Sequence, residues 1–181
     1  MVSTTSQAIL LVDGYNIIGT WHGLKKIRDN NGLEHARDCL IESLINYTGY
    51  KGLETKIVFD AHYQKTPSYE EKYGKSLSIY FTSYTETADT YIEKFCASFP
   101  RRNPETETRI IVATSDQAQR HTVVGYGAEW MSAQRLEKEI DTTKNKEKRN
   151  LRPRQKSQGR FLVNSLDSKT QKALSQMRFG I

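Results

Sequence analysis

The most informative part of the sequence is the stretch Ile9–Ile18, ILLVDGYNII, in which a run of apolar residues ends abruptly on a carboxylate. The apolar run predicts a buried strand, because a short continuous apolar segment bounded by turn-forming residues is typical of a strand covered on both faces. Asp13 ends that strand, and Gly14 and Asn16 follow before apolar residues resume. A carboxylate at the end of a buried strand needs a physical reason.

Strand-like and helix-like segments alternate along the rest of the chain. Further strands are predicted at 55–62 (TKIVFDAH), 76–82 (SLSIYFT), 109–116 (RIIVATSD) and 128–132 (AEWMS). Apolar residues at helical spacing predict helices over 33–45, 88–99, 116–124 and 132–143. Gly49 is placed to end the first helix, and Ser132 to cap the last. This alternation predicts an α/β fold: a three-layer sandwich with a mostly parallel central sheet of about five strands and helices on both faces.

The composition fits one folded domain. The chain has 181 residues, of which 36% are hydrophobic, and its mean hydropathy is −0.69. No segment approaches the ~20 apolar residues of a membrane-spanning helix, so no membrane partner is expected. Cys39 and Cys96 lack zinc-ligand spacing to histidines, which predicts buried free thiols in a reducing compartment. Without a visible secretory signal, we expect a bacterial cytoplasm, or a plastid stroma if a transit peptide has been removed.

The net charge of +6 is concentrated near the C-terminus. Between Lys144 and Arg160, eight lysines and arginines stand against the single Glu147. We expect residues 144–160 to form an exposed basic loop that binds an anionic polymer, although a solvated linker would carry the same charge. Around it we expect a flexible N-terminus at 1–7, the main domain at 8–143, and a C-terminal helix at 161–181 that packs on the domain.

Aspartates follow several of the predicted strands. Asp13, Asp60 and Asp116 end three of them, and Asp89 lies in the first turn of the helix that follows another. Because the carboxyl ends of parallel strands share one edge of a sheet, we expect these four acids to converge there.

Converging carboxylates repel one another, and these motifs contain no lysine or arginine to offset their charge. Two glutamates add to the acids: Glu93 lies one helical turn after Asp89, and Glu86 just precedes that helix. A hard divalent cation, Mg²⁺ or Mn²⁺, prefers such oxygen ligands. The acids therefore predict phosphodiester hydrolysis, in which a bound cation activates water and stabilises the leaving oxygen.

Each residue also has a structural interpretation, because aspartates after strands commonly cap helices. Asp116 is the best candidate for a cap, and Asp60 for a turn; Asn16 can bond the backbone of its helix or orient a water.

The sequence contains no motif for several other kinds of site. The sequence contains no G-x-G-x-x-G or G-x-x-x-x-G-K-[ST], so no nucleotide cofactor is expected, and no G-x-S-x-G. Tyr15 stands where a haloacid-dehalogenase-type phosphatase would need a second aspartate.

Six segments resemble, in order, the YacP-like branch of the NYN domains, which are relatives of the PIN and flap-nuclease fold. They are LLVDGYNII, ARDCLIESL, IVFDAH, FTSYTETADTYIE, VATSD and SAQRLEKEI. The resemblance covers residues 8–143 and the C-terminal helix, and DGYNII with ETADTYIE at this separation is its most specific part. One departure is Gln117, which stands where an aromatic residue often follows TSD.

The resemblance implies a Mg²⁺- or Mn²⁺-dependent endoribonuclease that associates with the ribosome and cuts mRNA in the decoding A site. It implies that Asp13 and Asp89 are the principal metal ligands, that Asp116 completes the cluster, and that Gly14 allows a tight turn. The second-rank candidates are Asn16, Asp60, Glu86 and Glu93. The residues expected to contact mRNA or rRNA phosphates are Lys144, Lys146, Lys148, Arg149, Arg152, Arg154, Lys156 and Arg160.

Two alternatives from other classes remain open. One is an RNA- or ribosome-binding adaptor without catalysis, and the other is a phosphatase acting on small phosphorylated molecules.

Three aromatic residues can stack on unpaired bases: Trp21, which is expected in an exposed loop, Tyr63 and Tyr69.

Overall fold

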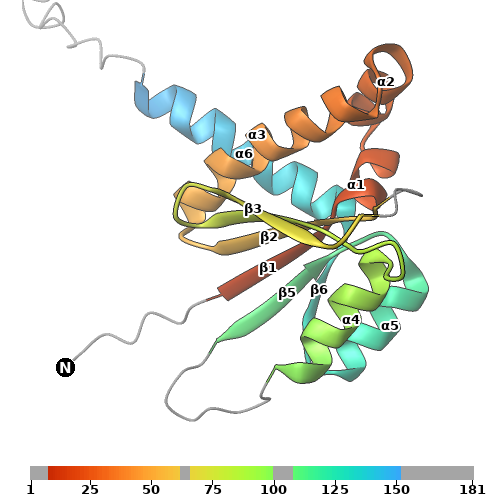
Figure 1. Ribbon diagram of the computed structural model, residues 1–181. Helices are drawn as coiled ribbons and strands as arrows, with labels where there is room; N and C mark the ends of the chain where they lie inside the picture. The colour runs from red at the N-terminus through yellow and green to blue at the C-terminus, as the bar shows by residue number, and fades with distance from the viewer. Residues whose placement is uncertain (1–7, 62–65, 100–107, 152–181) are drawn as a thin grey trace, which may run out of the picture. The chain divides into compact units, whose positions relative to one another are not determined.

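The strand β1 (Ala8–Asp13) lies inside a six-stranded sheet of order β3-β4-β2-β1-β5-β6 (Figure 1). The computed structural model describes residues 8–61, 66–99 and 108–151. The other strands are β2 (Glu54–Phe59), β3 (Tyr69–Tyr73), β4 (Leu77–Phe81), β5 (Arg109–Ala113) and β6 (Glu129–Met131). All neighbouring strands pair in parallel except β3, which runs antiparallel to β4 at one edge.

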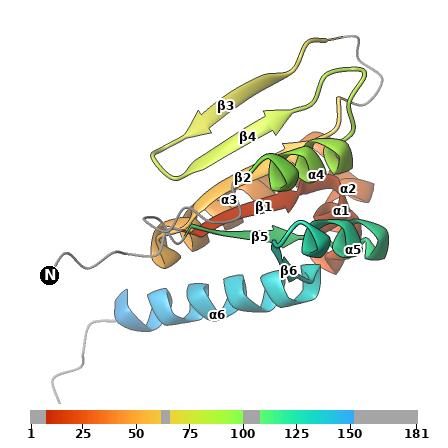
Figure 2. The ribbon, with the colours of Figure 1, turned by 90° about the horizontal axis from the view of Figure 1, so that it is seen from below.

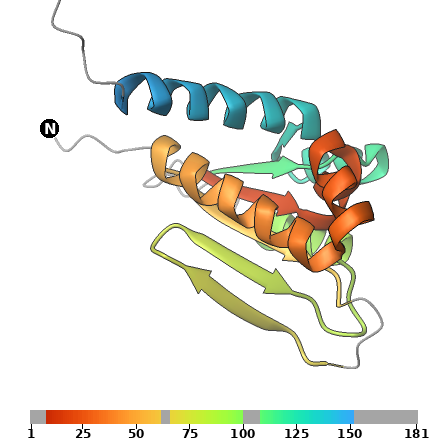
Figure 3. The ribbon, with the colours of Figure 1, turned by 90° about the horizontal axis from the view of Figure 1, so that it is seen from above.

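Alternate side chains of the central strands enter two separate cores, one on each face of the sheet. Leu10 and Val12 of β1 face a core shared with four helices, whereas Leu11 faces a core shared with two. The first group is α1 (Gly14–Thr20), α2 (His22–Asn31), α3 (Leu33–Lys51) and α6 (Ala133–Leu151), and the second is α4 (Ala88–Ser98) and α5 (Gln117–Gly125). Figures 2 and 3 show these two layers from opposite sides. The predicted three-layer α/β fold is thus confirmed, with six strands in the described residues where about five were predicted.

Three local predictions were wrong. The edge strand β3 was missed because all five of its residues, YEEKY, are exposed and show no apolar alternation. Gly49 does not end α3; the helix continues to Lys51, and Gly52 ends it in the left-handed conformation, at φ 65°. Trp21 is not in an exposed loop. It is 5% exposed, and its Nε1 donates a 2.8 Å hydrogen bond to the carbonyl oxygen of Ala133.

The last helix extends further than predicted. Ser132 caps α6 as expected, with its Oγ accepting from the backbone N–H of Arg135 at 3.2 Å, but α6 continues to Leu151. Residues 144–151 are therefore helical rather than a loop, since lysine, arginine and glutamate are good helix formers. The compact unit that holds the sheet extends to Lys146. The rest of the predicted basic loop, with Arg152, Arg154, Lys156 and Arg160, and the predicted helix 161–181 lie outside the described residues, as do residues 1–7.

No helix among the described residues is both long enough and apolar enough to cross a bilayer. Both cysteines are free thiols; Cys96 is buried as predicted, whereas Cys39 is only partly buried.

Candidate active site

The topology brings four aspartates to one edge of the sheet. Strands β2, β1 and β5 are neighbours and run in parallel, so their carboxyl ends lie together. Asp13 is the last residue of β1, the central strand of the three, and Asp60 comes directly after β2. Asp116 precedes α5, and Asp89 lies in the first turn of α4. Because α4 and α5 follow strands of this sheet, their N-termini begin at the same edge.

Asp13 is buried at the centre of this group. Its side chain is 7% exposed and caps α1, with Oδ1 accepting from the backbone N–H of Asn16 at 3.2 Å. Burial raises the pKa of Asp13 from 3.8 to about 7, against the lowering effect of the bond from Asn16. The charges of Asp89, Asp60 and Asp116 contribute smaller parts of this rise in pKa. Asp89, Asp60 and Asp116 are therefore close enough to Asp13 to raise its pKa.

Asp89 contacts both Asp13 and Gln119. Its carboxyl group lies near enough to that of Asp13 to affect its ionisation, and its Oδ1 accepts a 2.6 Å hydrogen bond from Nε2 of Gln119 in α5. Loss of hydration raises the pKa of Asp89, and the charges of Asp116, Asp60 and Glu93 add to this effect. We call Asp13 and Asp89, whose carboxyl groups each affect the pKa of the other, the acid pair.

Sequence reasoning missed Gln119, which is 2% exposed. Its Oε1 is a buried acceptor without a hydrogen-bond partner in the described part of the chain. Unpartnered buried polar atoms are uncommon and require an explanation. The one available signal was the spacing of Gln119 three residues after Asp116, the pattern of a helix N-terminus. That pattern predicts a local capping contact, however, and not a bond to another helix.

Asp116 and Asp60 both bind helix N-termini, as the capping interpretation predicted for Asp116. Oδ1 of Asp116 accepts from the backbone N–H groups of Ala118 at 2.7 Å and of Gln119 at 3.0 Å. Oδ1 of Asp60 accepts from the backbone N–H of Ala88 at 2.7 Å, and so holds the start of α4 against the end of β2. Both residues therefore position the helices that carry Asp89 and Gln119.

The remaining candidates lie around the acid pair in different roles. Asn16 joins α1 to the segment between β5 and α5, because its Oδ1 accepts from the backbone N–H of Ser115 at 2.7 Å. Glu93 lies near enough to Asp89 to raise its pKa. Glu86 instead forms an ion pair of 2.8 Å with Lys94, whose side chain is 69% exposed.

The donor set limits which cation fits. No group of three or more His, Cys, Asp or Glu side chains in residues 8–61, 66–99 and 108–151 is arranged to hold a metal ion. Zinc sites need three or four protein ligands, so this edge does not fit zinc. Mg²⁺, in contrast, is usually held by one or two carboxylates together with waters and substrate phosphates. The acid pair fits a hydrated Mg²⁺ or Mn²⁺, and the unpartnered Oε1 of Gln119 is a further polar acceptor beside it.

A row of aromatic rings leads from the site to the edge of the sheet. The ring of Tyr15 contacts Phe59 at 4.9 Å between centroids, Phe59 stacks on Phe81 at 5.6 Å, and Phe81 stacks on Tyr69 at 4.6 Å. The guanidinium of Arg37 lies over the ring of Phe81 at 5.7 Å. Tyr69 is 47% exposed and therefore presents an aromatic surface to solvent, whereas Tyr63 lies outside the described residues.

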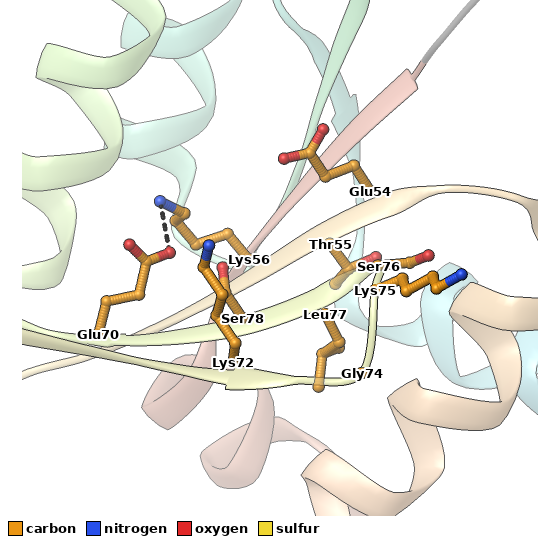
Figure 4. A pocket seen from close by; sticks show the side chains of 10 residues that line it. All are labelled: Glu54, Thr55, Lys56, Glu70, Lys72, Gly74, Lys75, Ser76, Leu77 and Ser78. Carbon is orange, nitrogen blue, oxygen red and sulfur yellow. Dashed lines mark ion pairs between the residues drawn. The ribbon is translucent and has the colours of Figure 1, made fainter.

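A polar pocket of about 220 Å³ lies at the opposite edge of the sheet, where β2 and β4 begin and β3 ends (Figure 4). Lys56 Nζ forms a 3.0 Å ion pair with Glu70 Oε1 in it. None of the four aspartates lines this pocket. It is separate from the acid pair.

A mostly parallel sheet between two helical layers, with acidic residues at its carboxyl edge, is the arrangement of a nuclease-type NYN domain. The chain belongs to the YacP-like NYN domain family, whose model matches residues 10–179. The family recognised from the sequence motifs is thus confirmed.

The chain resembles members of this family both in sequence and in structure. The chain is 38% identical over 144 residues to the Bacillus subtilis protein YacP, a match that covers 80% of this chain and 81% of YacP. The crystal structure of Rae1 (YacP) from Bacillus subtilis matches with a TM-score of 0.66 and 34% identity, covering 95% of both chains. A mutant of Rae1 in which leucine replaces a tryptophan matches with a TM-score of 0.68 and 32% identity, covering 94% of this chain and 99% of that one.

Proposed function

We propose that the protein is a Mg²⁺- or Mn²⁺-dependent endoribonuclease that hydrolyses mRNA at the acid pair. The observation that carries this proposal is the burial of Asp13 next to the charges of Asp89, Asp60 and Asp116. A buried carboxylate among like charges is unfavourable unless a cation compensates it. Membership of a nuclease-type family supports the same chemistry.

The chain's own residues have distinct tasks in this reaction. Asp13 and Asp89 would hold the cation, which when bound polarises the phosphodiester and lowers the pKa of water. Asp116, as a further negative group, strengthens the attraction for cations at this edge. Gln119 orients the carboxylate of Asp89, and Asn16 fixes the loop before Asp116. Water attack on phosphorus yields a 5′-phosphate and a 3′-hydroxyl; a 2′,3′-cyclic phosphate would contradict this mechanism.

RNA is the substrate that two exposed surfaces of the chain favour. The exposed Tyr69 suits base stacking, which tolerates any sequence. The basic stretch that begins at Lys144 suits phosphates of mRNA or of rRNA, which are recognised by charge. As the resemblance to the YacP-like family implies, we further propose that the enzyme is cytoplasmic and acts on messages at the ribosome, in the decoding A site.

The test is cleavage of a translated message on purified ribosomes with Mg²⁺. We expect the wild-type chain to cut, and Asp13→Asn and Asp89→Asn to bind ribosomes without cutting. Glu86→Gln is the matched control, because it removes a carboxylate that pairs with Lys94 outside the acid pair, and it should cut normally. Ribosome binding without cleavage by the wild type would instead support the adaptor. Turnover of generic small phosphoesters, unaffected by loss of the basic stretch, would support the phosphatase.

A further inference from the structure

A basic groove, which shares Lys146 with the basic stretch that begins at Lys144, lies between the last turn of α3 and the middle of α6. A groove of about 340 Å³ forms there, and four of the residues that line it are cations, against a single carboxylate, Glu139. The cations are Lys51, Arg135, Lys138 and Lys146. Figure 3 shows the two helices on the same face of the sheet. We call this surface the α3–α6 groove.

The carboxylate of Glu139 is already used within the groove. Its Oε2 accepts from the hydroxyl of Tyr47 at 2.7 Å and lies 3.5 Å from Lys51 Nζ, while its Oε1 accepts from Nε of Arg135 at 3.2 Å. Burial alone would raise the pKa of Glu139, but these hydrogen bonds and the charge of Lys51 outweigh it and lower the pKa. Glu139 is therefore ionised and compensated by its own neighbours.

Two cations of the groove have no such compensation. Lys138 and Lys146 lie two turns apart on α6, are exposed, and form no ion pair within the described residues. Tyr50, 45% exposed, lines the groove beside them. Two uncompensated ammonium groups attract a polyanion. The exposed aromatic ring beside them can pack against flat rings or sugars that the polyanion carries.

The other polar pocket, shown in Figure 4, differs in charge. Three lysines and two glutamates line it, and Lys56 is bonded to Glu70 at 3.0 Å. Its near-neutral lining offers little attraction to a polyanion. The positive charge of the α3–α6 groove is thus not a general property of hollows on this surface.

We propose that the α3–α6 groove binds the phosphate backbone of RNA as a second site, separate from the acid pair. The choice of RNA rests on the proposed function, since a ribonuclease meets long RNA. The two sites lie at opposite ends of the strands, because α3 ends just before β2 begins, whereas the acids follow the strand ends. With about 3.3 Å per residue, the six residues of β2 separate these edges by roughly 20 Å. The groove therefore holds RNA away from the cleaved bond.

The experiment compares two charge-matched double variants of the full chain. Lys138→Gln/Lys146→Gln removes the uncompensated lysines of the groove, and Lys72→Gln/Lys75→Gln removes two exposed lysines of the other pocket. Binding of a labelled long RNA is measured by fluorescence anisotropy between about 50 and 200 mM salt. We expect the groove variant to bind about tenfold more weakly at low salt, with a salt slope smaller by about two, and the control to change less than twofold. Lys138→Arg/Lys146→Arg should bind like wild type.

The proposal would be overturned if the two double variants lost RNA affinity equally, or if the groove variant lost none. Cleavage of a short RNA that reaches only the acid pair separates this outcome from failure of the proposed function. The wild-type chain should cut this short RNA, and Asp13→Asn should not. If Asp13→Asn also cuts it, the proposed nuclease site is wrong, while the binding result for the groove still stands by itself.

Discussion

Gln119 of α5 donates a 2.6 Å hydrogen bond from Nε2 to Oδ1 of Asp89 in α4, and so joins the two helices on one face of the sheet through a residue of the acid pair. Gln119 is buried, whereas Asp89 is exposed, so the fixed amide sets the orientation of the more exposed carboxylate. Groups that orient metal ligands in this way commonly change metal affinity or activity by about 10- to 100-fold when they are removed.

Gln119→Met should therefore weaken catalysis without unfolding the protein. Methionine fills a similar volume but donates no hydrogen bond, and it also removes the unpartnered Oε1. We expect a rate about tenfold lower at limiting Mg²⁺, partly restored by excess cation. Gln117→Met, in the same turn of α5 but exposed, is the control and should cut normally. A rate loss that excess Mg²⁺ leaves untouched would show that Gln119 does not act through the cation.

Stability without divalent cations should depend on Asp13 and pH. The pKa of Asp13 is about 7 in the folded chain against 3.8, so its contribution to stability is fully present below about pH 4 and is lost as pH rises through 7. This difference in pKa corresponds to as much as ~4 kcal/mol in the free energy of unfolding. Asp13→Asn keeps a good helix cap and removes the charge. In EDTA, denaturant unfolding should show the variant to be more stable than wild type at pH 8, with little difference at pH 4.

Asp116 allows its capping role to be separated from its charge. Asp116→Ala removes the bonds to Ala118 and Gln119 and should lower the free energy of unfolding by about 1 kcal/mol. Asp116→Asn keeps the cap and removes the charge, so it should preserve stability while lowering cleavage. Thermal unfolding and cleavage rates measured on both variants separate the effect of the cap from the effect of the charge. Full activity of Asp116→Asn would show that Asp116 acts only as a helix cap and that its charge has no role in cleavage.

Gly14 should not tolerate a side chain. A Cβ at this position would overlap the ring of Phe59, whereas a Cβ at Gly19 in the same helix would meet nothing within 4 Å. We expect Gly14→Ala to destabilise the protein by about 1–3 kcal/mol and to displace Asp13, and Gly19→Ala to be neutral or stabilising. Equal unfolding midpoints for the two variants would contradict this account. Gly14 is thus required for close packing against Phe59, since its φ is not positive.

The sequence predicted the parts of the fold that depend on local pattern. The run before Asp13 and the strands before Asp60 and Asp116 were recognisable because buried parallel strands are continuously apolar. The edge strand β3 was not, because its pairing with β4 depends on backbone hydrogen bonds and leaves its side chains exposed. The end of α6 was misplaced because a charged helix without an apolar stripe resembles a solvated loop.

The acids of the site could be placed at one edge from topology alone, but their hydrogen bonds could not. The bond between Gln119 and Asp89 spans 30 positions and that between Ser115 and Asn16 spans 99. No local pattern encodes a contact between elements so far apart in the chain. The burial of Trp21 was missed for the same reason, because its partner Ala133 lies 112 positions away.

The central claim is that Asp13 and Asp89 together hold a divalent cation, and Mn²⁺ binding followed by electron paramagnetic resonance tests it most directly. We predict that the wild-type chain and Glu86→Gln bind Mn²⁺ with the same affinity, and that Asp13→Asn and Asp89→Asn each bind at least about tenfold more weakly while remaining folded. Wild-type affinity in both acid-pair variants would contradict the claim and place any cation elsewhere.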